Sequence, residues 1–129
     1  MTQYYAVYFS PVDDQIAKYQ IIDESEIPSL TAAWAPPELP EWFQHMYVVD
    51  SETWLCIAPT LHQAQMNLFT RWVMCLNARV EDSLDWFGSE SKDLNKIMLE
   101  EVLHWVNIAK IQLFIDIKET DSLTDFLTD

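Results

Sequence analysis

The sequence is an acidic chain of 129 residues, half of them hydrophobic, in which 21 Asp and Glu stand against 7 Lys and Arg and give a formal net charge of −14. Its one glycine, Gly88, cannot supply the glycine-rich loops that bind dinucleotides or nucleoside triphosphates, nor the nucleophile elbow of hydrolases. The charge also opposes direct binding to nucleic-acid phosphates. We therefore expect a single compact domain over residues 1–129 that binds no cofactor and no nucleic acid directly.

The N-terminal half predicts two β-hairpins. Residues 3–9 are rich in Tyr, Val and Phe, and turn-forming residues connect them to a second strand-like segment, residues 17–22. Residues 46–49 and 53–57 repeat this arrangement around a short polar turn.

Residues 23–40 separate the two hairpins and show neither a helical nor a strand period. This segment begins with an acidic cluster and ends in Trp34-Ala35-Pro36-Pro37-Glu38-Leu39-Pro40. Because proline interrupts both helices and strand ladders, we expect a loop here, ordered at least in part.

Beyond residue 59 the period becomes helical. Apolar side chains recur at three- and four-residue steps, which predicts a helix from Leu61 to about Trp86 with a capping box formed by Thr60 and Gln63. We expect Gly88 to end this helix, because a left-handed residue is needed there and glycine adopts that conformation without steric cost.

A second helix follows this break, and the two form an αα-hairpin. Ser89 or Ser91 is expected to cap it, and its apolar stripe extends from Leu94 to Ala109. Residues 111–117 alternate like a strand but also fit a continued helix, and residues 122–127 fit a short amphipathic helix. The fold class we expect is α+β: an antiparallel sheet of about three to five strands, mostly N-terminal, packed on one face by the helical hairpin.

Cysteine usage and the N-terminus indicate a cytoplasmic protein. Cys56 and Cys75 lie in apolar segments that suit buried free thiols rather than a disulfide. The first residues lack the basic and apolar regions of a signal peptide, and no apolar stretch reaches the roughly 18 residues of a membrane span.

The sequence offers weak candidates for catalysis or metal binding. Glu101 and His104 stand at i, i+3, like one ligand unit of a di-iron carboxylate site, but such a site needs two units and two further glutamates. The Cys and His residues are scattered singly, without the close pairs of zinc sites. We therefore expect no catalytic residue and no metal site. A small enzyme using His45, His62, His104 and Glu101 is the third-ranked alternative.

Five of the six tryptophans fall into two groups. Trp54, Trp72 and Trp105 stand at expected core positions of a strand and two helices. Trp34 and Trp42 flank the proline-rich segment, where they are either anchors for a partner or a lid folded back on the sheet.

Acidic residues gather at expected turns and at the C-terminus. The row Asp121, Asp125 and Asp129, if helical, spaces carboxylates roughly 5–6 Å apart, similar to neighbouring phosphates of a nucleic-acid strand. An acidic surface that serves only solubility is the simpler alternative. Including the loop tryptophans, the candidate partner-binding residues are Asp13, Asp14, Asp23, Glu24, Glu26, Trp34, Trp42, Asp50, Glu52, Asp121, Asp125 and Asp129.

These features favour a non-enzymatic binding protein. We expect its acidic face to dock on and block the basic surface of a partner protein, a nucleic-acid-binding protein or nuclease, in the manner of immunity proteins, antitoxins, anti-restriction and anti-CRISPR proteins and DNA mimics. The alternative is a structural or adaptor subunit, including a homodimer, that uses its Trp-rich surfaces. Neither function involves a membrane.

Overall fold

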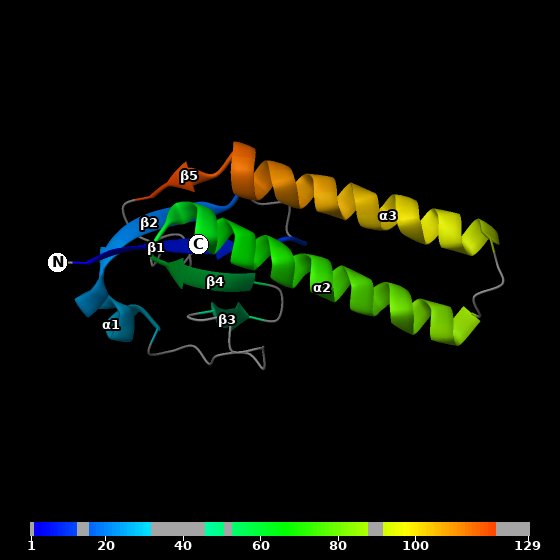
Figure 1. Ribbon diagram of the computed structural model, residues 1–129, viewed down its shortest axis with the longest axis horizontal. Coiled ribbons are helices and arrows are strands. Elements are labelled where there is room, and N and C mark those ends of the chain that lie inside the picture. Colours follow the sequence, from blue (N-terminus) through cyan, green and yellow to red (C-terminus); the bar gives the residue numbers. More distant parts are fainter. Residues whose placement is uncertain (1, 13–15, 32–45, 51–52, 88–91, 121–129) are drawn as a thin grey trace.

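A computed structural model describes residues 2–12, 16–31, 46–50, 53–87 and 92–120, and Figure 1 shows its elements in space. The strands form one five-stranded sheet in the order β3-β4-β1-β2-β5. They are β1 (Gln3–Phe9), β2 (Lys18–Asp23), β3 (Met46–Asp50), β4 (Thr53–Ala58) and β5 (Lys118–Glu119). The helices are α1 (Ile27–Thr31), α2 (Leu61–Phe87) and α3 (Lys92–Lys110), with a 3₁₀ turn η1 (Glu24–Glu26) and a π-helical turn η2 (Ile111–Ile115).

The α+β class and both hairpins are confirmed. β1 pairs antiparallel with β2 from Gln3 opposite Asp23, and β3 pairs antiparallel with β4. β1 also pairs antiparallel with β4, which joins the hairpins into one sheet. The sheet is not wholly antiparallel, however, because β5 pairs with β2 in parallel.

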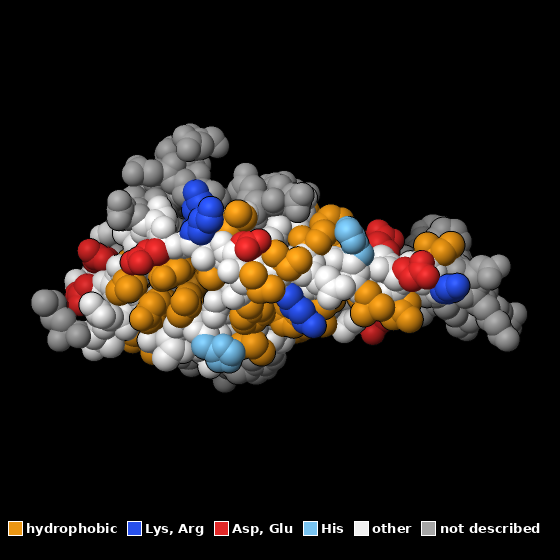
Figure 2. Space-filling view, turned by 90° about the horizontal axis from the view of Figure 1, so that it is seen from above, with side chains coloured by type: hydrophobic (Ala, Val, Ile, Leu, Met, Phe, Trp, Pro, Cys, Tyr) orange, Lys and Arg blue, Asp and Glu red, His pale blue; other side chains and the backbone are white. Residues whose placement is uncertain are grey.

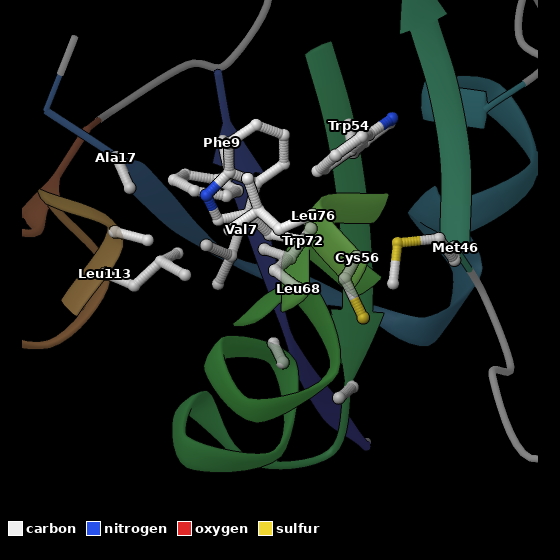
Figure 3. Close-up of a cluster of buried hydrophobic side chains, with 13 residues drawn as sticks. Val7, Phe9, Ala17, Met46, Trp54, Cys56, Leu68, Trp72, Leu76 and Leu113 are labelled. Carbon is white, nitrogen blue, oxygen red and sulfur yellow. The ribbon is translucent and has the colours of Figure 1, made fainter. Parts of the chain in front are cut away.

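Successive side chains of β1 and β4 point alternately to the two sides of the sheet, and both sides are apolar. Val7 and Phe9 of β1 and Trp54 and Cys56 of β4 point toward α2, where they meet a stripe that includes Leu68, as Figure 3 shows. Successive strand side chains point to opposite faces, so the residues between them build a second cluster. That cluster contains Ala6, Tyr8, Ile22, Leu55 and Ile57, with Ile27 at the start of α1 packed against it.

The acidic and proline-rich segment between the hairpins was expected to be a loop, and this is wrong for its first part. Residues 24–26 form η1 and residues 27–31 form α1. Pro28 is compatible with a helix here, because it stands in the first turn where backbone N–H groups have no partner within the helix. The remainder, residues 32–45, lies outside the described residues.

The start of α2 agrees with its sequence signal in part. The Thr60 hydroxyl accepts a hydrogen bond from the Gln63 backbone N–H at 3.1 Å, as in a capping box. The side chain of Gln63 instead donates to Asn67 Oδ1 at 2.8 Å, one turn further along the helix. The helix ends at Phe87, close to the expected Trp86. Gly88 and the expected caps Ser89 and Ser91 lie outside the described residues.

For residues 111–117 the sequence fits either a strand or a helix, and in the structure the helix continues through η2. The Asp116 N–H donates to the Ile111 carbonyl across five residues at 2.7 Å, the pattern of a π-turn. Within η2, the Leu113 carbonyl accepts from Gln65 Nε2 of α2. The chain then leaves the helix, and the Lys118 N–H donates to the Ala17 carbonyl at 3.1 Å to begin β5. The expected helix over residues 122–127 lies outside the described residues.

The helical hairpin is longer than the sheet that it covers. Figure 1 shows the first half of α2 lying across the strands and the distal halves of α2 and α3 extending beyond them. The last buried side chain described on α2 is Leu76, and on α3 the only buried side chain described is Ala109. The distal hairpin is therefore held mainly by contacts between the two helices.

Three tryptophans connect the sheet to both helices. The Trp54 and Trp72 rings lie 5.9 Å apart, and Trp105 of α3 meets Trp72 edge-on at 6.3 Å. Arg71 lies over the Trp54 ring at 5.4 Å, and Arg79 lies over Trp72 at 5.7 Å. The core roles expected for Trp54 and Trp72 are confirmed, while Trp105 is half-buried against the same cluster.

Candidate functional site

The acidic turn, defined as Asp23, Glu24, Ser25 and Glu26, is held in place by its own hydrogen bonds. Asp23 caps η1 by accepting from both the backbone N–H and the hydroxyl of Ser25, and Glu26 accepts from the Asp23 N–H at 3.2 Å. The Glu24 N–H donates to the Thr2 carbonyl at 3.0 Å, just before β1. These bonds order the turn before any partner arrives, which reduces the entropy lost on binding.

The same contacts favour the charged form of Asp23. The hydrogen bond from the Ser25 hydroxyl, followed by that from the Ser25 backbone N–H, lowers the pKa of the Asp23 carboxyl below its ordinary value. Asp23 is therefore ionised throughout the neutral range, and the acidic turn keeps a negative charge that is fixed in position.

Hydrophobic side chains of β1 and β2 lie beside the acidic turn on the same face of the sheet. Tyr5 stands opposite Ile21 in the register of the two strands, and its ring lies 6.2 Å from that of Tyr19. Ile21 is 38% exposed. Paired residues of neighbouring strands point to the same side of a sheet, so Gln3 and Asp23 share this face.

An acidic residue from the C-terminal part of the chain also lies on this face. Glu119 of β5 is paired with Tyr19 and is exposed. We call the set Tyr5, Tyr19, Ile21, Asp23, Glu26 and Glu119 the β2 surface. Figure 2 shows hydrophobic side chains gathered at the sheet end of the molecule with acidic side chains bordering them. An open groove of about 430 Å³, lined by Gln3, Ile21, Ile22, Asp23 and Glu26, lies within it.

The structure describes only part of the predicted partner-binding set. Asp23, Glu24 and Glu26 are brought together in one ordered turn. Asp50 was expected in a turn, but it is the last residue of β3 and is paired with Thr53 of β4. The other candidates lie outside the described residues: Asp13, Asp14, Trp34, Trp42, Glu52, Asp121, Asp125 and Asp129.

The sequence interpretation missed the hydrophobic half of the β2 surface. Tyr5, Tyr19 and Ile21 were treated only as strand residues, and Glu119 was not considered. The sequence did contain a signal for Tyr5, Tyr19 and Ile21, because odd-numbered positions of both strands share a face once Gln3 is paired with Asp23. The position of Glu119 depends on the parallel β2–β5 pair, which joins residues about 100 apart in the chain.

Neither cysteine shows the features of a catalytic nucleophile. Cys56 is buried in the sheet, and burial raises the pKa of its thiol to about 12, although the hydrogen bond from Asn67 Nδ2 at 3.7 Å acts in the opposite direction. The thiol is thus protonated at neutral pH. Cys75 is a half-buried free thiol on α2.

The histidines do not combine with Glu101 into an acid–base site in the part of the chain that is described. His104 is exposed and stands edge-on to Trp105 at 5.6 Å. A pocket of about 390 Å³ between α2 and α3 is lined by Glu101 with Arg79, Met98 and Trp105, whereas His104 is not among its lining residues. His62 is exposed in the first turn of α2, and His45 lies outside the described residues.

No group of three or more His, Cys, Asp or Glu side chains is arranged to hold a metal ion within the described residues. Of the helices described, none has an apolar stretch sufficient to cross a bilayer.

Comparison with known proteins gives no family and no relative: no family model matches the sequence, and no significant match was found among curated proteins or solved structures.

Proposed function

We propose that this chain is a non-enzymatic binding protein that docks its acidic surface on the basic surface of a partner protein and blocks it. The partner class we propose is a nucleic-acid-binding protein or nuclease, whose basic surface normally meets phosphates. The chain would then belong with immunity proteins, antitoxins, anti-restriction and anti-CRISPR proteins and DNA mimics in its mode of action. We also propose that it acts in the cytoplasm.

The observation that carries this proposal is the β2 surface. It combines an exposed hydrophobic centre at Ile21 with fixed carboxylates at Asp23 and Glu26. Tight protein interfaces share this arrangement of an apolar centre and a polar rim. The lowered pKa of Asp23 supports it, because the charge remains present at any physiological pH.

The distribution of charge along the chain also favours the sheet, rather than the helical hairpin, as the docking region. Residues 61–110, which contain the helical hairpin, have five basic and seven acidic residues. The remaining residues have two basic and fourteen acidic residues. In the described part of these residues, which forms the sheet and its turns, six acidic residues stand against two basic ones, and this excess would draw a basic partner toward the sheet.

The Trp-rich form of the adaptor alternative has less support. Trp54 and Trp72 are buried in the core and Trp105 is half-buried, so no tryptophan side chain described is exposed enough to anchor a partner. Trp34 and Trp42 stay candidates on sequence grounds alone.

The test begins with affinity capture from the host and identification of the captured protein. We expect a basic nucleic-acid-binding protein whose release is promoted by excess duplex DNA, and whose binding or cleavage of DNA falls as the chain is added up to one equivalent. The proposal would be contradicted if excess duplex DNA did not release the captured protein. It would also be contradicted if a saturating amount of the chain left the partner's binding or cleavage of DNA unchanged.

Variants then locate the surface. Glu119→Lys on the β2 surface and Glu24→Lys in the adjoining acidic turn should slow association with the captured partner, while Glu81→Lys on α2 makes the same charge change away from both and should not. Ile21→Ala should accelerate dissociation, since it removes the exposed centre. Equal effects of Glu81→Lys and Glu24→Lys would show that only net charge matters.

A further inference from the structure

The outer edge of β2 is covered over only part of its length. Among the described strands only β5 lies on this edge, and Figure 1 shows the two strands side by side. β5 is two residues long and pairs with Lys18 and Tyr19, whereas β2 continues to Asp23. An uncovered strand edge presents backbone N–H and C=O groups that can pair with another extended chain. The second half of β2 is therefore a candidate pairing site.

The hydrogen bonds to β5 show which backbone groups of β2 point to this edge. The Lys118 N–H donates to the Ala17 carbonyl at 3.1 Å. The Thr120 N–H donates to the Tyr19 carbonyl at 2.9 Å. Because backbone groups of successive strand residues point alternately to the two neighbouring strands, those of Ile21 also point outward. Among the described residues no backbone group is bonded to Ile21 on this side, so its N–H and carbonyl can accept a further strand.

The next outward-pointing residue, Asp23, limits the site to a short segment. Its N–H already donates to the Glu26 carboxylate at 3.2 Å within the acidic turn. A strand added in line with β5 would therefore make its two backbone hydrogen bonds with Ile21 and end beside the acidic turn. The open groove of about 430 Å³ that Ile21, Asp23 and Glu26 line lies beside this stretch and leaves room for side chains of the added strand.

The charges at this edge determine which kind of segment fits it. Ile21, Asp23 and Glu119 share one face of the sheet, because Glu119 is paired with Tyr19 and alternate residues of β2 point to the same side. The lysines of the two strands, Lys18 and Lys118, are paired with each other and point to the opposite face. Opposite charges on neighbouring strands stabilise a sheet and like charges destabilise it. A segment with basic side chains therefore complements the open half of the edge.

The same charges oppose two other occupants of the edge. A second copy of the chain would add the same carboxylates to those already present. Residues 121–129, which follow β5 in the sequence, contain three Asp and no Lys or Arg. Either occupant would bring like charges together, and only a basic segment would not.

From these observations we propose that an extended, basic segment of the partner protein pairs with the β2 edge at Ile21, in line with β5, and places its basic side chains beside Asp23, Glu26 and Glu119. Strand addition to an exposed sheet edge is a recurring mode of peptide recognition, in which backbone bonds provide affinity and side chains provide specificity. This inference rests on the proposed function, because it states how the same surface holds the partner.

A short synthetic peptide of alternating lysine and valine, titrated into the isotope-labelled chain, tests the pairing without the partner. We expect the Ile21 amide to exchange with solvent roughly tenfold more slowly when the peptide is bound. The Ile22 amide is the internal control, since it points to β1 and its exchange should not change. The corresponding peptide of glutamate and valine should not bind. No protection of Ile21, or equal protection by both peptides, overturns the proposal.

Two substitutions at Ile21 separate the backbone donor from the side chain. Ile21→Pro and Ile21→Ala both remove the exposed side chain, but only proline removes the N–H. Proline is tolerated in an edge strand where the missing N–H faces solvent. Ile21→Pro should weaken binding of the lysine–valine peptide about fivefold more than Ile21→Ala does. Equal weakening overturns the proposal, provided that slow exchange of the Ile22 amide shows β1 and β2 still paired. If they are not, the exchange experiment on the unmodified chain decides alone.

The captured partner distinguishes this inference from the proposed function. With the partner bound, the Ile21 amide should be protected as it is by the peptide. A partner that the chain inhibits while the Ile21 amide stays unprotected overturns the strand pairing but not the proposed function. If the peptide pairs and no nucleic-acid-binding partner is captured, the proposed function fails and the edge site does not. Protection of Ile21 that rises with the concentration of the chain alone would identify a second copy as the occupant and overturn the proposal.

Discussion

Gln65 of α2 donates its side-chain amide to the Leu113 carbonyl at 2.7 Å, which ties the main helix to η2 across 48 residues of sequence. Both residues are buried, and the bond satisfies a carbonyl in the irregular turn where α3 gives way to β5. One side chain thus connects α2 to the turn that positions the last strand.

Loss of this bond should cost more stability than loss of an exposed one. We expect Gln65→Ala to lower the free energy of unfolding by about 1–3 kcal/mol, because it leaves the buried Leu113 carbonyl without its donor. Ser25→Ala removes the exposed hydrogen bond from the Ser25 hydroxyl to Asp23 and should cost less than about 1 kcal/mol. Urea unfolding of the two variants gives the comparison, and equal losses would contradict it.

Replacement of Gln112 should have the opposite effect on stability. Its side chain is only 4% exposed, and among the described residues neither its amide nitrogen nor its amide oxygen has a hydrogen-bond partner. Replacing it by Met, of similar length, should raise the free energy of unfolding by about 1 kcal/mol or more, because it removes the cost of burying an unpaired amide. Thermal and urea unfolding measure this. A loss of stability would mean that a bound water pairs with the amide.

The two thiols should differ in reactivity. Native protein treated with a thiol reagent at neutral pH should be labelled at Cys75, which is half-buried, far faster than at Cys56, which is buried with its pKa raised to about 12. Both should react at once in denaturant. Mass spectrometry of the peptides assigns the label, and rapid native labelling of Cys56 would count against its position in the core.

The raised pKa of Cys56 also predicts loss of stability in alkali. The thiol stays protonated in the folded state up to about pH 12, whereas in the unfolded chain it ionises near its ordinary value of 9.0. Its contribution is therefore complete below about pH 9 and falls as the pH rises toward 12. Between pH 8.5 and 10.5 the unfolding free energy should fall more steeply than in Cys56→Ala, by about 2 kcal/mol. Parallel slopes would exclude this cause.

For Asp23 the expected effect is a loss of stability as the solution becomes acidic. Its pKa is lowered by the Ser25 hydrogen bonds, so its contribution is present above the ordinary pKa of an aspartate and is lost as the pH falls through the lowered value. Asp23→Asn should reduce the difference in melting temperature between neutral and strongly acidic solution, with Glu24→Gln as the control on the same turn. An unchanged difference would mean that the capping bonds do not form in solution.

The hairpins and α2 were predictable because each is long enough for its period to appear in the sequence. The alternation in β1 and the three- and four-residue steps from Leu61 are local signals that the tertiary structure reinforces. α1 was missed because its five residues are too few to show a period. Residues 111–117 were ambiguous because the wider π-turn disturbs the helical spacing.

For the candidate site, the sequence predicted the acidic turn but not its surroundings. Acidic residues at a strand end are exposed in almost any fold, so Asp23 and Glu26 could be assigned without a register. Ile21 and Glu119 join them only through the pairing of β2 with β1 and with β5. The strand register therefore determines which hydrophobic groups accompany the charges, and local sequence does not specify it fully.

The row of rings from Trp54 through Trp72 to Trp105 passes from the sheet into both long helices with separations of 5.9 and 6.3 Å. Indoles at such spacing share an asymmetric environment and produce near-ultraviolet circular dichroism that disappears when their packing is lost, even where the helices persist. The protein thus contains its own optical probe at the junction between sheet and hairpin. Detachment of α3 would separate Trp105 from Trp72 without disturbing the Trp54–Trp72 pair, so partial opening and complete unfolding should have different spectra.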